Sequence, residues 1–167
     1  MNSLALLDVA KLTSPNPVSL VCSRTPAGVT NLGTVSWWTY LSLEPAAIGF
    51  AMAKTSYTGE MVRAGKRVVL TIPGETLAKQ VMQCGSSTGR TTDKARDFNI
   101  ELTDIPDCDI RIPVGSVAAI ECSLREYVDV GDHYFYICDV RKAYGDESKR
   151  ALFAWKGYAK IAPASCA

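Results

Sequence analysis

Two of the three tryptophans stand at the end of a polar run, NLGTVSWW, at residues 31–38. A buried strand favours Val, Ile and Leu at such positions. The side chains of Asn31, Thr34 and Ser36, with unpaired backbone N–H groups, suit the polar edge of a planar heterocycle. Either tryptophan would then cover the aromatic face. Alternatively, both tryptophans pack against a second copy of the chain and the polar residues face water.

A second candidate site lies where a short apolar run meets a predicted helix start, in AKTSYT at residues 53–58. A phosphate needs hydrogen-bond donors and a positive field, and the free N–H groups of a first helical turn supply both. Lys54, Thr55 and Ser56 add a charge and two hydroxyls. The alternative is an ordinary helix cap.

Two loops carry further polar candidates. STGRTTDK, at residues 87–94, places Arg90 and Lys94 among glycine and hydroxyl side chains. This loop either clamps a phosphate or is simply solvated. The only histidine, His133, follows Gly-Asp beside a predicted hairpin tip, where it is solvated or reaches a ligand across a partner's surface.

Several common chemistries are excluded. One histidine rules out a multi-histidine metal site, and six scattered cysteines argue against a zinc knuckle, so we expect no metal. The chain has neither a G-x-G-x-x-G after a strand nor a P-loop motif. A nucleotide cofactor, if present, binds in some other way.

Composition indicates one domain spanning residues 1–167, with 21% charged and 47% apolar residues. The formal charge of +1 argues against nucleic-acid or membrane partners recruited by bulk charge. The N-terminus lacks a signal-peptide pattern, and no stretch is long enough to span a membrane. The cysteines sit in apolar, strand-like runs, which favours free buried thiols and a cytoplasmic location.

The elements that would position these residues are mostly strands. Apolar, β-branched runs predict strands at 17–23, 34–40, 46–53 and 66–73. Thr55 or Ser56 would cap a helix that Gly65 ends, a second helix spans 75–85, and a short helix starts near Asp93. Two alternating segments, 116–130 and 133–144, flank a Gly-Asp turn and read as a hairpin. The pattern predicts a closed or nearly closed barrel with helical insertions.

Taken in order, these segments resemble the flavin reductase-like family of FMN-binding split barrels, and within it the flavoredoxin group. The matching motifs are Pro17 to Val21, Asn31 with Thr34, Ser36 and Trp37, Ser42 with Pro45, Ser56 to Thr58, Val68 to Pro73, Thr88 to Lys94, and Gly131 to His133. The resemblance covers about residues 15–160.

The resemblance implies a mainly β fold with helical insertions: a six-stranded antiparallel split β-barrel of Greek-key type. It also implies a homodimer with one FMN per subunit. The residues that the resemblance implies for cofactor binding are Asn31, Thr34, Val35, Ser36 and Trp37 around the isoalloxazine, and Ser56, Tyr57, Arg90 and Lys94 toward the phosphate. The candidate segment 53–58 adds Ala53, Lys54 and Thr55 to the expected cofactor site. His133 is the implied catalytic residue, near the nicotinamide or the flavin.

The implied activity is an oxidoreductase that passes electrons from NADH or NADPH through FMN to an acceptor. The sequence departs from the family at Arg63-Ala64-Gly65, at Ala95 and at the doubled tryptophan, which leaves the donor and acceptor open. The alternatives are a flavoredoxin-like carrier reduced by a protein partner, a relative of pyridoxamine-phosphate oxidases, and a flavin-binding or structural barrel without turnover.

Overall fold

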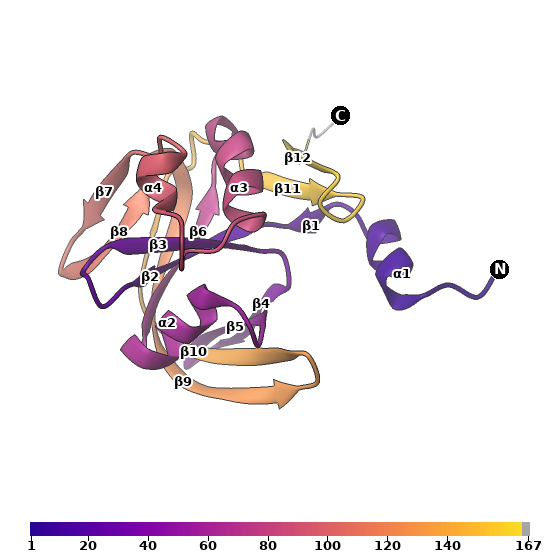
Figure 1. The fold of residues 1–167 in the computed structure, drawn as a ribbon, viewed down its shortest axis with the longest axis horizontal. Helices are drawn as coiled ribbons and strands as arrows, with labels where there is room; N and C mark the ends of the chain where they lie inside the picture. Colours follow the sequence, from indigo (N-terminus) through magenta and orange to yellow (C-terminus); the bar gives the residue numbers. More distant parts are fainter. Residues whose placement is uncertain (165–167) are drawn as a thin grey trace.

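The body of the molecule is an antiparallel sheet of seven strands (Figure 1). The structure is a computed structural model that describes residues 1–164. Across the sheet the strands follow the order β3, β2, β6, β9, β10, β5, β4. Their bounds are Ser19–Arg24 (β2), Thr30–Val35 (β3), Trp38–Leu43 (β4), Ala46–Ala53 (β5), Arg67–Pro73 (β6), Ser116–Val130 (β9) and His133–Gly145 (β10). The prediction of a mainly β fold is confirmed.

The expected six-stranded split barrel, closed or nearly closed, differs from the structure in strand number and in closure. β3 and β4 form the two edges of the sheet and do not pair with each other within residues 1–164. The predicted strand 34–40 is in fact two strands, because β3 ends at Val35 and β4 begins at Trp38. The Trp37 carbonyl instead accepts a hydrogen bond from the N–H of Ala51 on β5, at 2.8 Å. Since β3 also contacts β5, the sheet is strongly curled but open.

The longest hairpin, β9 and β10, confirms the prediction from the Gly-Asp turn. Gly131 has a φ of 81°, a conformation that glycine adopts without steric cost. Antiparallel pairing sets His133 opposite Ala53 at the end of β5. The register of the hairpin thus carries the single histidine to the start of the candidate phosphate segment.

The predicted helices are present with small shifts in their ends. Ser56 caps α2 (Tyr57–Gly65), and its hydroxyl accepts the Gly59 N–H at 3.2 Å. The left-handed residue that ends this helix is Lys66, with a φ of 55°, rather than Gly65. The predicted helix 75–85 begins as a 3₁₀ turn, η1 (Glu75–Leu77), and continues as α3 (Ala78–Gly85). Asp93 caps α4 (Lys94–Asp97).

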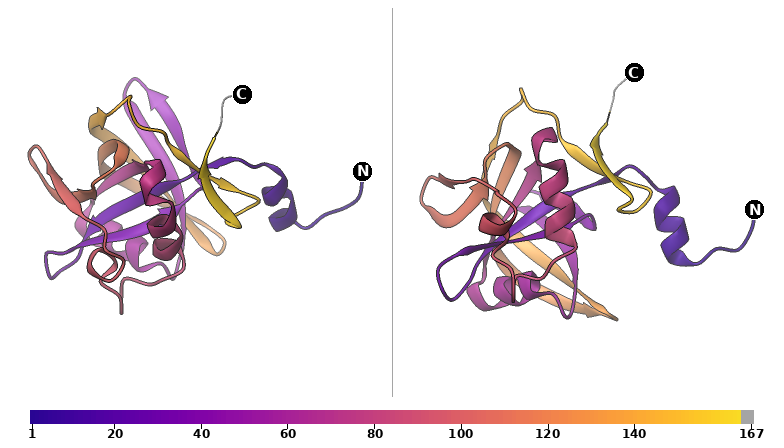
Figure 2. Two further views of the ribbon diagram at one scale, coloured as in Figure 1. Left: turned by 90° about the horizontal axis from the view of Figure 1, so that it is seen from above. Right: turned by 45° about the horizontal axis from the view of Figure 1, so that its top comes forward.

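Three parts of the fold have no counterpart in the sequence prediction. They are helix α1 (Leu6–Leu12), the hairpin of β7 (Leu102–Ile105) and β8 (Cys108–Pro113), and a small sheet of β1 (Asn16–Pro17), β11 (Leu152–Trp155) and β12 (Lys160–Pro163). α1 projects from the body beside the small sheet (Figures 1 and 2). None of its residues is buried, so packing within this chain does little to stabilise it.

Both faces of the central strands are buried, which explains their nearly continuous apolar sequences. On β2, Leu20 belongs to one hydrophobic cluster and Val21 to another, and Val69 and Leu70 alternate in the same way on β6. The first cluster includes Val81 of α3 and Ile110 of β8, and the second includes Val62 of α2 and Phe50 of β5. The sheet therefore supports α3 on one side and α2 on the other.

The five cysteines that the structure describes are all free thiols. Cys22, Cys84, Cys122 and Cys138 are buried as predicted, whereas Cys108 is half-buried, and Cys166 lies outside the described residues. Burial raises the pKa of Cys22 to about 12 and that of Cys84 to about 11. These two thiols are protonated and unreactive at neutral pH.

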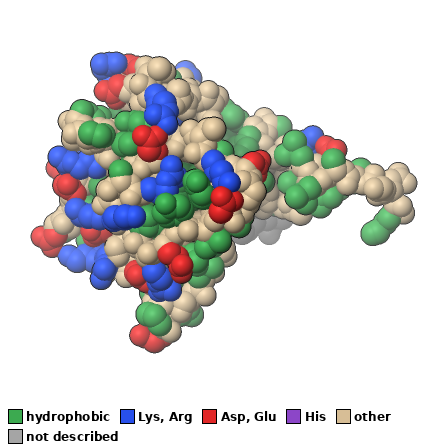
Figure 3. All heavy atoms as spheres, turned by 60° about the horizontal axis from the view of Figure 1, so that its bottom comes forward, with side chains coloured by type: hydrophobic (Ala, Val, Ile, Leu, Met, Phe, Trp, Pro, Cys, Tyr) green, Lys and Arg blue, Asp and Glu red, His purple; other side chains and the backbone are tan. Residues whose placement is uncertain are grey.

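The surface carries no large single-sign field on the face that Figure 3 shows, where Lys and Arg alternate with Asp and Glu. This mixture agrees with the formal charge of +1. Among residues 1–164, no helix is both long and apolar enough to cross a membrane.

Candidate functional site

Three adjoining cavities form a continuous trough along one side of the molecule. The first, about 450 Å³, lies beside Trp37 and His133. It shares Thr34, Met52 and Ser56 with a second of about 230 Å³. The second shares Tyr57, Gly89 and Lys94 with a third of about 480 Å³, which Asn31 and Arg90 also line. We call the first cavity the aromatic end of the trough and the region around Lys94 its cationic end.

At the aromatic end, Trp37 and His133 come together from distant parts of the sequence. Their ring centroids are 5.1 Å apart and the planes are inclined by 41°. Trp37 is 51% exposed, so much of its ring is open to a ligand. Nδ1 of His133 lies 2.7 Å from a carboxylate oxygen of Asp132, and this contact lowers the pKa of the Asp132 carboxyl. The carboxylate holds the imidazole in one orientation.

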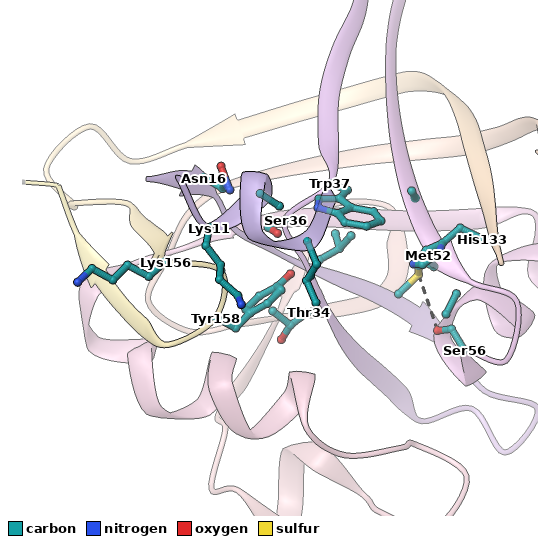
Figure 4. Close-up of a pocket in the computed structure, with 16 residues that line it drawn as sticks. Lys11, Asn16, Thr34, Ser36, Trp37, Met52, Ser56, His133, Lys156 and Tyr158 are labelled. Carbon is teal, nitrogen blue, oxygen red and sulfur yellow. Dashed lines mark hydrogen bonds between the residues drawn. The ribbon is translucent and has the colours of Figure 1, made fainter. Parts of the chain in front are cut away.

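Hydroxyl groups line the floor between the two ends, and backbone contacts fix two of them. The Thr34 hydroxyl donates to the carbonyl of Val81 at 2.6 Å, which leaves its lone pairs to accept from a ligand. The Ser56 hydroxyl accepts the Gly59 N–H at 3.2 Å and donates to the Met52 sulfur at 4.0 Å, a weak bond that a ligand acceptor could replace. In Figure 4, Thr34, Met52 and Ser56 lie around the same space, so the floor combines one apolar side chain with two hydroxyls.

At the cationic end, Lys94 is only 4% exposed and its ammonium donates to the Cys84 carbonyl at 2.7 Å. Within residues 1–164 it forms no ion pair with a carboxylate, and burial lowers its pKa. A buried ammonium without a counter-ion is costly unless an anion joins it. Lys94 thus marks the place where the trough would take a negative charge.

Arg90 and the loop glycines shape the rim of this end. The Arg90 guanidinium pairs with Glu60 and lies 5.2 Å from the centroid of the Tyr57 ring. Gly89 approaches Asn31 so closely that a Cβ there would stand 2.0 Å from the Asn31 amide oxygen. The Asn31 amide in turn donates to Thr58 at 2.8 Å, which connects β3 to α2. A larger residue at position 89 would push the loop away from the trough.

The structure gathers all but one of the residues that the sequence suggested. The suggested residues that line the trough are Asn31, Thr34, Val35, Ser36, Trp37, Ala53, Thr55, Ser56, Tyr57, Arg90, Lys94 and His133. Lys54 lies elsewhere, because its ammonium pairs with Asp129 at 2.7 Å and sits 5.3 Å from the Tyr134 ring centroid. Lys54 therefore contacts the β9–β10 hairpin.

Sequence reasoning missed several residues of the trough. Met52 lies inside the predicted apolar strand 46–53, and no local pattern distinguishes a floor residue from a core residue. Gly85 and Gly89 carried the signal of a close backbone approach, which the sequence analysis did not use. Lys11 of α1 and Tyr158 of the β11–β12 turn lie in segments for which no element was predicted.

The sequence match identifies the family to which this arrangement belongs. Residues 12–162 match the model of the flavin reductase like domain. The chain is therefore a member of the flavin reductase-like family.

Curated relatives and solved structures agree with this assignment. A flavin reductase of Pseudomonas putida is 28% identical over 144 residues, which is 86% of this chain and 81% of that protein. An uncharacterized protein of Pyrococcus abyssi is 27% identical over 109 residues, which is 64% of this chain and 61% of that protein. This second match spans less than two thirds of the relative's length.

Several solved structures resemble the chain over almost its whole length, and two of them illustrate the likeness. An FMN-binding protein from Thermus thermophilus with bound p-hydroxybenzaldehyde superposes with a TM-score of 0.85 at 20% identity, covering 99% of this chain and 95% of that one. A flavoredoxin from Methanosarcina acetivorans gives a TM-score of 0.84 at 17% identity, covering 100% and 94%. At these identities the likeness establishes the fold.

Proposed function

We propose that the protein is an oxidoreductase that binds FMN in the trough, with the isoalloxazine toward the aromatic end and the phosphate at the cationic end. The observation that carries this proposal is the buried Lys94, which lacks a carboxylate partner within residues 1–164. A phosphate would supply the missing negative charge. The first turn of α2, whose Tyr57 and Thr58 line the same cavity as Lys94, adds the favourable field of a helix N-terminus.

The remaining residues of the trough suit the rest of this cofactor. An isoalloxazine has a flat apolar body and a polar edge, which match the Met52 floor and the Thr34 and Ser56 hydroxyls. Bound FMN would accept a hydride from NADH or NADPH and pass the electrons on. The protein itself would hold the two rings face to face and limit the access of water.

His133 has an orienting role in this proposal. Hydride transfer to a flavin requires no general base from the protein, which suits a chain with one histidine. The Asp132 carboxylate at 2.7 Å holds the imidazole beside Trp37, where it would hydrogen-bond the nicotinamide amide or the flavin edge.

A second candidate is a flavoredoxin-like electron carrier, reduced by a protein partner instead of a nicotinamide. The observation that favours it is the exposure of Trp37, since an open aromatic end would let a partner approach the flavin. Both candidates use the same cofactor site and differ only in the electron donor.

We further propose that the single domain forms a homodimer in the cytoplasm. Edge strand β4 leaves Tyr40 and Leu43 exposed, Leu43 to 87%, and it starts directly after Trp37. A second copy would cover this apolar edge next to the trough. The free thiols of residues 1–164 suit a reducing compartment.

The test is the visible spectrum of protein loaded with FMN and desalted, recorded before and after anaerobic addition of NADH and then NADPH. Retained flavin bands that bleach promptly support the reductase and identify the donor. Retained bands that do not bleach favour the carrier. Loss of all flavin on desalting, together with no binding in a titration with FMN, would overturn the proposal.

A further inference from the structure

The outer wall of the aromatic end comes from the two extremities of the fold. Leu7, Ala10 and Lys11 of α1 and the turn Lys156–Tyr158 between β11 and β12 line the cavity opposite Met52. The N–H of Lys156 donates to the Ser14 hydroxyl, and a Cβ at Gly157 would lie 3.6 Å from the Lys11 side chain. The helix and the turn are thus in contact and form one wall.

Tyr158 is the aromatic residue of this wall, and its hydroxyl points inward. In Figure 4 the phenol extends across the cavity toward Ser36, while Lys156 points away from it. Burial around the hydroxyl raises the pKa of Tyr158, whereas hydrogen bonding with Ser36 acts in the opposite direction. The residue as a whole is still 44% exposed, so its ring retains a face open to the cavity.

The aromatic end therefore contains exposed rings from three separate segments of the chain. Trp37 follows β3, His133 begins β10, and Tyr158 lies in the β11–β12 turn. Partly exposed aromatic rings around one cavity are typical of a site for a planar ligand, because burying their faces is favourable only when a flat partner fills the gap. Met52 and these rings line one cavity of about 450 Å³, so a second planar group would lie between the Met52 floor and Tyr158.

We infer that Tyr158 binds the nicotinamide end of the electron donor, by packing against its ring and donating its hydroxyl proton to the carboxamide. This inference rests on the proposed function, since it needs a flavin on the Met52 floor. The hydroxyl lies on the Ser36 side of the cavity in Figure 4, where it would meet the polar edge of the ring. Apolar Leu7 would cover the remaining edge of the donor.

The test uses FMN-loaded protein and NAD⁺, which binds without reducing the flavin. Three variants are compared with the wild type: Tyr158→Ala, Tyr158→Phe, and Tyr127→Ala as the control. Tyr127 has nearly the same exposure, 43%, and lies on β9 away from the lining of the trough. Quenching of tryptophan fluorescence gives the Kd for NAD⁺, a flavin titration gives the Kd for FMN, and turnover gives the KM for NADH.

We expect Tyr158→Ala to raise the Kd for NAD⁺ and the KM for NADH about tenfold while the Kd for FMN changes less than about twofold. Tyr158→Phe keeps the ring and loses the hydroxyl, so it should weaken NAD⁺ binding only about threefold. Tyr127→Ala should match the wild type. Unchanged NAD⁺ binding in Tyr158→Ala, or a change confined to the KM of the acceptor, would overturn the inference. If the wild type itself fails to bind FMN, the proposed function has failed instead.

Discussion

The two ends of the trough hold their side chains in different ways. At the cationic end, Lys94 is buried, bonded to a backbone carbonyl and enclosed by a loop that only glycine permits. At the aromatic end, Trp37 and Tyr158 are about half exposed, and α1 contributes to the wall without burying any residue of its own. A rigid buried end suits a retained group, and an open end with a loosely held wall suits a group that enters and leaves.

The largest loss of FMN affinity should follow removal of the positive charge at the cationic end. Lys94→Met keeps the length of the side chain and removes the ammonium, so FMN affinity should fall about 100-fold, as for a lost charge-assisted hydrogen bond. The unliganded variant should melt at a higher temperature than the wild type, because a buried unpaired charge is gone. Fluorescence titration and thermal unfolding measure the two effects.

Lys54→Met is the matched control for this change. Lys54 precedes α2 but pairs with Asp129 outside the trough, so its removal should leave FMN affinity within about twofold. Equal losses in both variants would indicate a general effect of positive charge and contradict a specific role for Lys94.

The next-largest loss of FMN affinity should follow a substitution at Gly89, where the loop of the cationic end closely approaches Asn31. A Cβ in Gly89→Ala would stand 2.0 Å from the Asn31 oxygen, so the loop must shift, and FMN affinity should fall about tenfold with a loss of about 1–3 kcal/mol in stability. Gly65→Ala is the control, since a Cβ there meets nothing within 4 Å at a helical position. That variant should be more stable by about 0.5–1 kcal/mol with unchanged affinity.

A smaller effect is expected at the aromatic end. His133→Ala should raise the KM for the nicotinamide donor about fivefold and leave the Kd for FMN unchanged, because the imidazole orients a group that comes and goes. Asp132→Asn, which weakens the hold on the ring, should give a smaller rise in the same direction. Steady-state kinetics on FMN-loaded protein measure both, and identical KM values would remove the orienting role.

The smallest effect is a dependence on pH at the cationic end. Burial lowers the pKa of Lys94 below its ordinary value of 10.5, so above the lowered pKa the unfolded chain holds a proton there that the folded protein has lost. The buried Lys94 ammonium therefore destabilises the folded protein fully below the lowered pKa. This destabilisation decreases as the pH rises from the lowered pKa to 10.5. The stability difference between the wild type and Lys94→Met should narrow over that range in denaturant titrations, and a constant difference would contradict it.

Turn and cap residues in the sequence correctly predicted the hairpin and the helix that begin or end at them. Gly131 with Asp132 defined the long hairpin, and Ser56 defined the start of α2, because turn and cap chemistry act over a few residues. The strand expected at 34–40 was wrong, since nothing within that run indicates that Ser36 and Trp37 cross from one edge of the sheet to the other. That crossing depends on the curl of the whole sheet.

The same reasoning explains what was found and missed at the site. Trp37, Lys94 and His133 were identifiable because their types and neighbours suggest chemistry before any fold is known. Lys54 had the right type and place in the sequence, yet Asp129 on the hairpin draws it away from the trough. No sequence pattern marked Tyr158 as a site residue, because only the tertiary structure brings the β11–β12 turn and Ser36 to the same cavity.

The central claim is that Lys94 receives the phosphate of a bound flavin. The most direct measurement compares the affinities for FMN and for riboflavin, which lacks the phosphate, in the wild type and in Lys94→Met. The account predicts that the wild type prefers FMN by about 100-fold and that the variant binds both ligands nearly equally. Equal affinities in the wild type, or a preference for FMN that survives in Lys94→Met, would contradict it.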